Sequence, residues 1–189
     1  GIDGSWWNEI GQAASDADHD FFHIVLNHLR SVNGNAMGVP YYFLAWEALS
    51  HDRDDVLGYL DHYLNPNLDL VTVELAENAS DLSTYQKDYE SLLRYIQAKA
   101  PNARILVVDD FWTLYNRAEL KKAAVENTGA EFVSLDGIKD NPAYHCGLGT
   151  VVYDAYGNAH VVDDANVAVH PGDAGMAAIA SRIIEVIGE

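Results

Sequence analysis

The clearest pattern of hydrophobic and polar positions lies near the C-terminal end of the chain, in residues 167–187. Apolar residues recur there at intervals of three and four, which predicts one helix with a continuous buried face. These residues are Met176, Ile179, Ala180, Ile183, Ile184 and Ile187. Pro171 and Gly172 break the chain before the helix, and Asp173 is a good N-cap. His170 therefore lies on a short segment that leads into a well-anchored helix.

Most of the remaining chain alternates between helix-like and strand-like segments. Apolar residues follow a helical spacing in residues 16–32, 52–64, 83–99 and 116–127. Short apolar runs between turn residues predict strands at 39–46, 68–75, 103–108 and 131–135, and a hairpin of residues 151–153 and 159–162. The run at 103–108 is typical of a fully buried parallel strand, and Ser83 with Gln86 predicts a capping box. This alternation predicts an α/β fold with a mostly parallel sheet.

The helix expected at 16–32 differs from the others because no strand precedes it. Each of the other long helices follows a strand or a strand-like segment, whereas residues 1–15 have the Gly-rich composition of a loop. The chain therefore resembles an α/β domain that lacks its first strand.

Composition and charge narrow the classes of function. A chain of 189 residues suits one domain with a sizeable core. Its 29 acidic and 11 basic residues give a net charge of -18, which argues against nucleic acid or an anionic membrane as a partner. No apolar run is long enough to span a bilayer. The single cysteine, Cys146, excludes an internal disulfide and a cysteine-based zinc site. Composition decides neither the compartment nor the oligomeric state.

Four residues are candidates for chemistry. His170 could be a general base held still beside a helix, or a surface histidine next to a turn. Asn78 follows the strand expected at 68–75, where its amide could stabilise an oxyanion or simply belong to a turn. Gly11 could bring a backbone N–H close to a reacting centre or permit a turn. Glu77 could be a general acid or a hydrogen-bonded loop residue.

The segments around these residues, in this order, resemble signature blocks of the SGNH (GDSL-type) hydrolase superfamily. The segment NEIGQAAS with Gly11 is similar to the second block. The segment ELAENASD with Asn78 is similar to the third block, although Ala76 stands where Gly is usual. The segment VAVHPGDAGMAAIA with His170 is similar to the last block. The resemblance spans residues 6–187, and it is strongest to a subgroup often found among bacterial carbohydrate-active proteins.

The resemblance implies a flavodoxin-like three-layer α/β/α sandwich, which would cover residues 1–189 as a single domain. It also implies a serine esterase that needs no metal and no cofactor. His170 would be the general base, and the backbone N–H of Gly11 and the amide of Asn78 would contribute to the oxyanion hole. The substrate would be a small acyl ester, such as an acetylated carbohydrate.

The block that carries the nucleophilic serine in this family is missing. No GDSL-like segment follows a strand before Gly11, and neither Ser5 nor Ser15 matches the position of the nucleophile. The missing block coincides with the missing first strand. We therefore expect the natural protein to have roughly a dozen or more residues upstream of Gly1, enough for a strand and its loop. These residues would carry the serine.

The residue that orients the histidine also departs from the family pattern. The family has Asp-x-x-His, whereas Val167 stands three residues before His170 and cannot orient an imidazole. Asp163 or Asp164 could serve instead. A backbone carbonyl could also serve, which would give a Ser–His dyad.

The alternative to an esterase is a non-catalytic relative of the same fold with a carbohydrate-binding or structural role. Four tryptophans in or near loops expected at one edge of the sheet could stack on a sugar ring or pack inside the protein. They are Trp6, Trp7, Trp46 and Trp112. A serine-containing segment upstream of Gly1 would favour the esterase.

Overall fold

The computed structural model describes residues 6–7, 11 and 13–188. Contacts within the chain divide it into two compact units. Residues 41–135 form the central unit, and the residues before and after them form the terminal unit. The expectation of a single domain over residues 1–189 stays a prediction.

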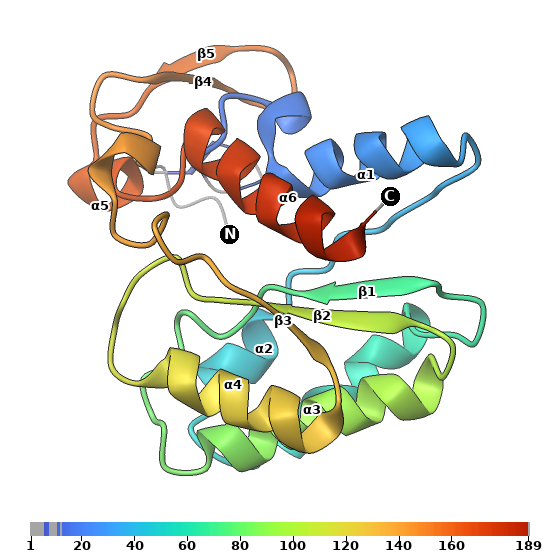
Figure 1. Cartoon of the computed structure of the whole chain (residues 1–189). Helices are drawn as coiled ribbons and strands as arrows, with labels where there is room; N and C mark the ends of the chain where they lie inside the picture. The colour runs from blue at the N-terminus through green and yellow to red at the C-terminus, as the bar shows by residue number, and fades with distance from the viewer. Residues whose placement is uncertain (1–5, 8–10, 12, 189) are drawn as a thin grey trace. The chain divides into compact units, whose positions relative to one another are not determined.

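The central unit contains a three-stranded parallel sheet, shown in Figure 1. The strands are β1 (Leu70–Val73), β2 (Arg104–Val108) and β3 (Glu131–Val133). They lie in the order β1-β2-β3, so β2 is paired on both sides. The predicted α/β class with a parallel sheet is thereby confirmed.

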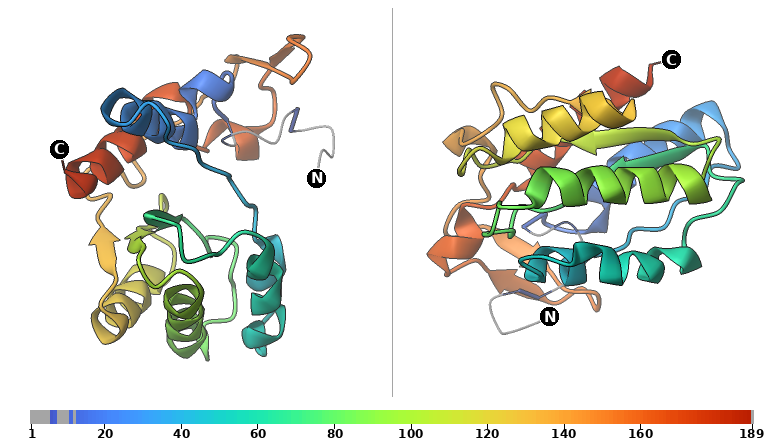
Figure 2. Two further views of the ribbon diagram at one scale, coloured as in Figure 1. Left: turned by 90° about the vertical axis from the view of Figure 1, so that its right-hand side faces the viewer. Right: turned by 90° about the horizontal axis from the view of Figure 1, so that it is seen from below.

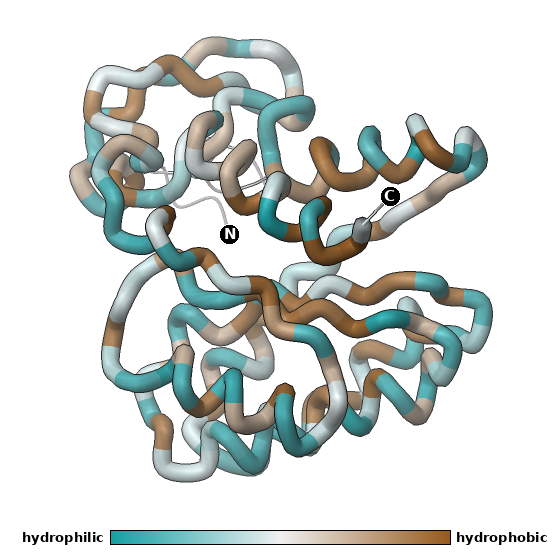
Figure 3. The backbone as a smooth tube through the Cα atoms, in the orientation of Figure 1, coloured by the Kyte–Doolittle hydropathy of each residue, from teal (hydrophilic) through white to brown (hydrophobic). Residues whose placement is uncertain are grey.

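The central position of β2 explains its unbroken apolar run. Ile105, Leu106, Val107 and Val108 are at most 5% exposed, so the side chains on both faces of the strand are buried. Figure 3 accordingly shows hydrophobic colour along the middle of the sheet. The prediction of a fully buried parallel strand at 103–108 is confirmed, with the strand beginning one residue later.

Helices of the central unit provide the core beneath the sheet. They are α2 (Leu44–Ala48), the 3₁₀ helix η2 (Arg53–His62), α3 (Tyr85–Lys99) and α4 (Arg117–Thr128). Figure 2 shows α3 and α4 side by side against one face of the sheet. Apolar side chains from both helices and from the strands form one cluster, including Val73, Leu92, Leu93, Ile96, Ile105, Val107 and Val125.

The terminal unit is built from two long helices and a small hairpin. The helices α1 (Phe21–Val32) and α6 (Asp173–Ile187) pack against each other (Figure 1). The hairpin pairs β4 (Val151–Tyr153) with β5 (Ala159–Val161). Shorter elements are the 3₁₀ helices η1 (Ala17–His19) and η3 (Pro142–Tyr144) and the helix α5 (Ala165–Ala168). The predicted C-terminal helix and hairpin are confirmed.

The prediction of a strand at 39–46 is wrong. Residues 39–43 have no regular secondary structure, and α2 begins at Leu44. Phe43 and Trp46 are both buried in the core cluster of the central unit. Because these two residues are three apart, one helical turn directs both toward the core, whereas a strand would direct them to opposite faces.

Two other local predictions need correction. The segment 52–64 contains a 3₁₀ helix instead of an α-helix. The capping box of Ser83 and Gln86 does not form, because the N-cap of α3 is Thr84 and the Gln86 amide donates to Glu90. No helix in the described part of the chain combines the length and the apolar composition needed to cross a membrane.

Candidate functional site

Backbone hydrogen bonds hold the segment around His170 in place. The N–H of Cys146 donates to the carbonyl of His170 at 2.8 Å, and the N–H of Gly172 donates to the carbonyl of Tyr144 at 3.1 Å. A Cβ atom at Gly172 would lie 2.7 Å from Cα of Cys146, so this close approach requires glycine. The glycine that follows Pro171 therefore serves to position the backbone of His170.

The imidazole of His170 is held by a hydrogen bond and a ring contact. Its Nδ1 lies 2.6 Å from the carbonyl oxygen of Asn166. Because a carbonyl can only accept, Nδ1 carries the proton of the neutral ring and Nε2 is the basic nitrogen. The ring makes a T-shaped contact with Trp6, with centroids 4.8 Å apart. Burial lowers the pKa of His170 below its usual 6.5, so the neutral imidazole predominates at pH 7.

The acceptor on Nδ1 of His170 is the backbone carbonyl of Asn166, four residues earlier in the chain. Asp164 is the N-cap of α5, where its carboxylate accepts from the N–H of Asn166 at 2.7 Å. Asp164 therefore helps to position the His170 imidazole indirectly, because it holds Asn166, whose carbonyl binds the ring. Asp163 is exposed. Among the acceptors that the sequence left open, the structure has a backbone carbonyl on Nδ1.

Trp6→Ala should raise the pKa of His170 toward 6.5, because removal of the indole admits water to the imidazole. An NMR titration of the His170 Hε1 resonance in the wild type and the variant measures this shift. Trp7→Ala is the matched control, since Trp7 stacks on His160 instead, with ring centroids 5.1 Å apart. An unchanged His170 pKa in Trp6→Ala would show that the indole does not desolvate the imidazole.

The segment that contains Gly11 is anchored to the start of α6. A Cβ atom at Gly11 would overlap the side chain of Asp20, so this position also requires glycine. The N–H and the hydroxyl of Ser15 donate to the two carboxylate oxygens of Asp173 at 2.7 and 2.8 Å. The predicted N-cap role of Asp173 is therefore wrong, because its carboxylate binds Ser15 and the N-cap of α6 is Gly172.

Asn78 lies in a tight turn after β1. The N–H of Ala79 donates to the carbonyl of Ala76 at 3.1 Å, which makes Asn78 the third residue of this turn. The Asn78 side chain is exposed, and its Nδ2 donates to Oε2 of the buried Glu47 at 2.7 Å. Nδ2 carries a second N–H, which can donate to another acceptor. The turn follows the carboxyl end of a parallel strand, where α/β proteins place their ligand sites.

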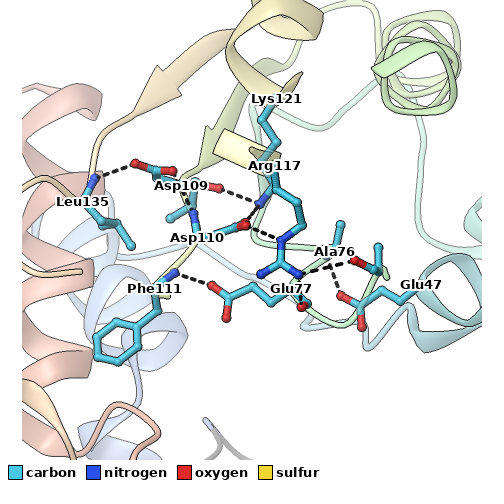
Figure 4. A network of polar contacts seen from close by, with 11 residues as sticks. Glu47, Ala76, Glu77, Asp109, Asp110, Phe111, Arg117, Lys121 and Leu135 are labelled. Carbon is cyan, nitrogen blue, oxygen red and sulfur yellow. Dashed lines mark hydrogen bonds and ion pairs between the residues drawn. The ribbon is translucent and has the colours of Figure 1, made fainter. Parts of the chain in front are cut away.

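A buried cluster of charges follows the carboxyl end of β2 (Figure 4). Asp110 accepts from Nε of Arg117 at 2.7 Å and from Nζ of Lys121 at 2.5 Å. All three side chains are at most 2% exposed. Arg117 and Lys121 are four residues apart at the start of α4, so one face of the helix presents both cations to the same carboxylate. The three groups compensate one another's charge away from water.

Arg117 also ties this cluster to the turn that carries Asn78. Its Nη1 donates to the carbonyl of Glu77 at 2.5 Å and reaches the carbonyl of Ala79 at 3.4 Å, on either side of Asn78. The Glu77 carboxylate accepts from the backbone N–H of Phe111 (Figure 4). Of the two interpretations of Glu77, these contacts favour the hydrogen-bonded loop residue.

Two carboxyl groups beside this cluster bind protons more tightly than exposed glutamates do. Burial raises the pKa of Glu74 to about 7, the charge of Lys121 opposes this shift, and the charges of Glu47 and Asp110 add to it. Burial and the charge of Glu74 also raise the pKa of Glu77 well above its usual value. Glu74 as a whole residue is nevertheless only partly buried. Carboxyl groups that titrate near neutral pH are frequent at functional sites.

Glu74→Gln should raise the free energy of unfolding at pH 8 by about 1–3 kcal/mol. The folded protein releases the Glu74 proton near pH 7, whereas the unfolded chain releases it near pH 4.5. Charged Glu74 therefore destabilises the fold increasingly as the pH rises from 5 to 8, and glutamine removes this effect. Urea unfolding at both pH values measures the difference.

Glu131→Gln is the control for this measurement, because Glu131 forms an exposed ion pair with Arg104 at 2.8 Å and its pKa is lowered. This variant should show no gain in stability at pH 8. A Glu74→Gln variant that is no more stable than the wild type at pH 8 would refute the predicted destabilisation by Glu74.

The four tryptophans are divided between the core and partly exposed positions. Trp46 is fully buried and makes T-shaped contacts with Tyr85 and Tyr89, so of the two alternatives for this residue the structure has packing inside the protein. The other three are half-buried: Trp6, Trp7 and Trp112. Among these, the two N-terminal tryptophans contact histidines of the terminal unit.

Glu47 and the cluster around Asp110 were not predicted from the sequence. The cluster had a visible signal, since two aspartates directly follow an apolar strand and two cations spaced by four open the next helix. Glu47 had no comparable signal, because it precedes its partner Asn78 by 31 residues and belongs to a segment predicted as a strand. Ser5 and residues 8–10 and 12 of the predicted Gly11 block lie outside the described residues.

No group of three or more His, Cys, Asp and Glu side chains in the described ranges is arranged to hold a metal ion. Comparison of the chain with models of protein families, with curated proteins and with solved structures found no match.

Proposed function

We propose that the protein is a serine esterase of the SGNH type with a flavodoxin-like fold. The observation that carries the proposal is the state of the His170 imidazole, which has Nδ1 bound to the Asn166 carbonyl and a lowered pKa. A general base requires a fixed tautomer with a basic Nε2 and a neutral form at the working pH. A surface histidine beside a turn requires neither.

In the proposed reaction, a serine hydroxyl attacks the carbonyl carbon of a small acyl ester while Nε2 of His170 takes its proton. The bond to the alcohol oxygen then breaks, and His170 returns the proton to the leaving alcohol. Water attacks the acyl-serine by the same route, which releases the acid and restores the serine. The resemblance to the family assigns this serine to residues upstream of Gly1.

The negative charge that develops on the carbonyl oxygen needs N–H donors, and the proposal assigns this role to Gly11 and Asn78. Asn78 suits the role because its exposed amide has a second N–H beyond the one bound to Glu47. For Gly11 the support is the resemblance of its segment to the second block of the family, since the space beside its Cα is filled by the side chain of Asp20. The proposed reaction uses no metal and no cofactor.

An acetylated carbohydrate is the substrate class that we propose for this esterase. Support comes from the resemblance to a carbohydrate-active subgroup and from Trp6, whose indole lies against the proposed base. Aromatic rings offer an apolar face with a polar edge, which suits contact with a sugar. The acyl and alcohol groups are otherwise open to experiment.

Hydrolysis of p-nitrophenyl acetate and of acetylated sugars, by the protein with its natural upstream residues, tests the proposal. We expect saturable turnover whose rate rises with pH around a midpoint below 6.5, because only the neutral imidazole of His170 can take the serine proton. A fluorophosphonate probe should label one serine, which mass spectrometry locates. The chain of residues 1–189 alone should be inactive.

A non-catalytic carbohydrate-binding relative is the second candidate, and the half-buried Trp6 and Trp7 are the observation that favours it. Binding of acetylated sugars without turnover, measured by calorimetry, would support this candidate against the esterase. Turnover by residues 1–189 alone would instead locate the nucleophile within this chain, and Ser15 would be the first serine to replace.

A further inference from the structure

Glu47 binds the Asn78 turn at two points. Its side chain is buried, and it comes from α2. Oε1 accepts from the backbone N–H of Ala76 at 2.5 Å, and Oε2 accepts from Nδ2 of Asn78 at 2.7 Å. One carboxylate therefore holds both the backbone at the start of the turn and the exposed amide within it.

The carboxylate determines which way the Asn78 amide points. An ionised carboxylate only accepts hydrogen bonds, so the amide nitrogen faces Glu47 and the amide oxygen is directed away from it. Rotation of the amide by half a turn would bring Oδ1 of Asn78 against Oε2 of Glu47, two acceptors with no proton between them. With one N–H on Glu47, the planar amide has its second N–H in a fixed direction.

The backbone of the turn is constrained as well. Ala76 has φ 89°, in the left-handed region that favours glycine, and its N–H is held by Glu47. Arg117 binds the carbonyl groups of Glu77 and Ala79 on both sides of Asn78. The backbone around Asn78 is thus held by several groups, whereas the hydrogen bond observed on its side chain is the one to Glu47.

We infer that Glu47 is a positioning residue, which orients the Asn78 amide so that its second N–H meets the oxyanion of the ester substrate. The inference rests on the proposed esterase function. Preorganised donors of this kind stabilise a transition state because they need no reorientation during the reaction. Loss of the orientation should therefore lower kcat and leave KM nearly unchanged.

Glu47→Gln is the decisive substitution because it keeps the size of the side chain. A glutamine at this position has one acceptor oxygen, so it can accept from either the Ala76 N–H or the Asn78 amide but not from both. Its NH2 group then lies against the remaining N–H donor. It can also donate to Oδ1 of a rotated Asn78, so a single orientation is no longer imposed. We expect kcat for p-nitrophenyl acetate to fall about ten- to hundredfold, as small errors in position can cost that much.

A double-mutant cycle separates positioning from a general loss of structure. Asn78→Ala should lower kcat by about 10²–10³, the usual effect of removing one oxyanion donor. If Glu47 acts through Asn78, adding Glu47→Gln to Asn78→Ala should lower kcat no further. Glu47→Asp, which has both acceptor oxygens, should recover part of the kcat that Glu47→Gln loses.

Glu90→Gln is the matched control, because Glu90 accepts from Nδ2 of Asn127 at 2.7 Å in the same unit. This variant should have the kcat of the wild type. An unchanged kcat in Glu47→Gln, or a full additional loss in the Asn78→Ala background, would overturn the inference while the esterase stands. If the wild-type protein does not hydrolyse the ester, or hydrolyses it equally well without His170, both the esterase proposal and the inference about Glu47 are wrong.

Discussion

Replacement of His170 by alanine should lower kcat/KM for ester hydrolysis by a factor of about 10²–10⁴, the usual contribution of a general base. The loss should lie in kcat, because the imidazole acts on the serine proton and not on the bound substrate. The assay uses the protein with its natural upstream residues and p-nitrophenyl acetate, and circular dichroism shows whether the variant is folded.

His160→Ala is the matched control for this substitution. His160 belongs to the same unit, stacks on Trp7 with centroids 5.1 Å apart, and bonds Asp154 at 3.1 Å through Nε2. Both variants remove a half-buried imidazole with an aromatic neighbour, so both test the structural effect of the loss. Equal activity of the two variants would mean that His170 has no special part in the reaction.

Replacement of Asp110 by asparagine should lower the free energy of unfolding by about 3–5 kcal/mol, because it leaves two buried cations without a counter-charge. Asp110 lies between Arg117 and Lys121, and all three side chains are at most 2% exposed. A loss of this size is a large part of the roughly 5–15 kcal/mol that stabilises a typical domain. Urea unfolding followed by tryptophan fluorescence measures it.

Glu131→Gln is the comparison, since it removes a carboxylate from an ion pair in which both partners are 43% exposed. Exposed pairs contribute about 0–1 kcal/mol, so the two losses should differ severalfold. A loss below about 1 kcal/mol in Asp110→Asn would show that other groups compensate the charges of the two buried cations. The same variant should weaken the Arg117 contacts that hold the Asn78 turn.

Local patterns in the sequence predicted most elements of regular structure. The apolar run before Asp109 became the buried strand β2, and the spacing of apolar residues after Gly172 became α6. Both predictions depend on the spacing of apolar residues over a short segment. This spacing reflects whether one face or both faces of the element are buried. The failure at 39–46 has the same origin, because a short apolar run of aromatic residues fits a strand or a helical turn equally well.

The candidate site was only partly visible in the sequence. His170, Asn78 and Gly11 were predicted from their positions in the sequence and from the resemblance of their segments to the signature blocks, and the structure adds the groups that bind them. Asn166 contributes a backbone carbonyl, which any residue type could supply, so no side chain identifies it as the partner of His170. Glu47 is recognisable as a partner of Asn78 only when α2 and the turn after β1 are seen together.

By itself, the sequence determined the elements whose formation depends on residues close to one another in the chain. These include the parallel strands, the hairpin and the helix that follows His170. Only the tertiary structure decided which polar groups meet, such as Ser15 with Asp173 and Glu47 with Asn78, which are 158 and 31 residues apart. The physical reason is that periodic burial acts over a few residues, whereas a hydrogen bond between distant residues depends on the path of the whole chain between them.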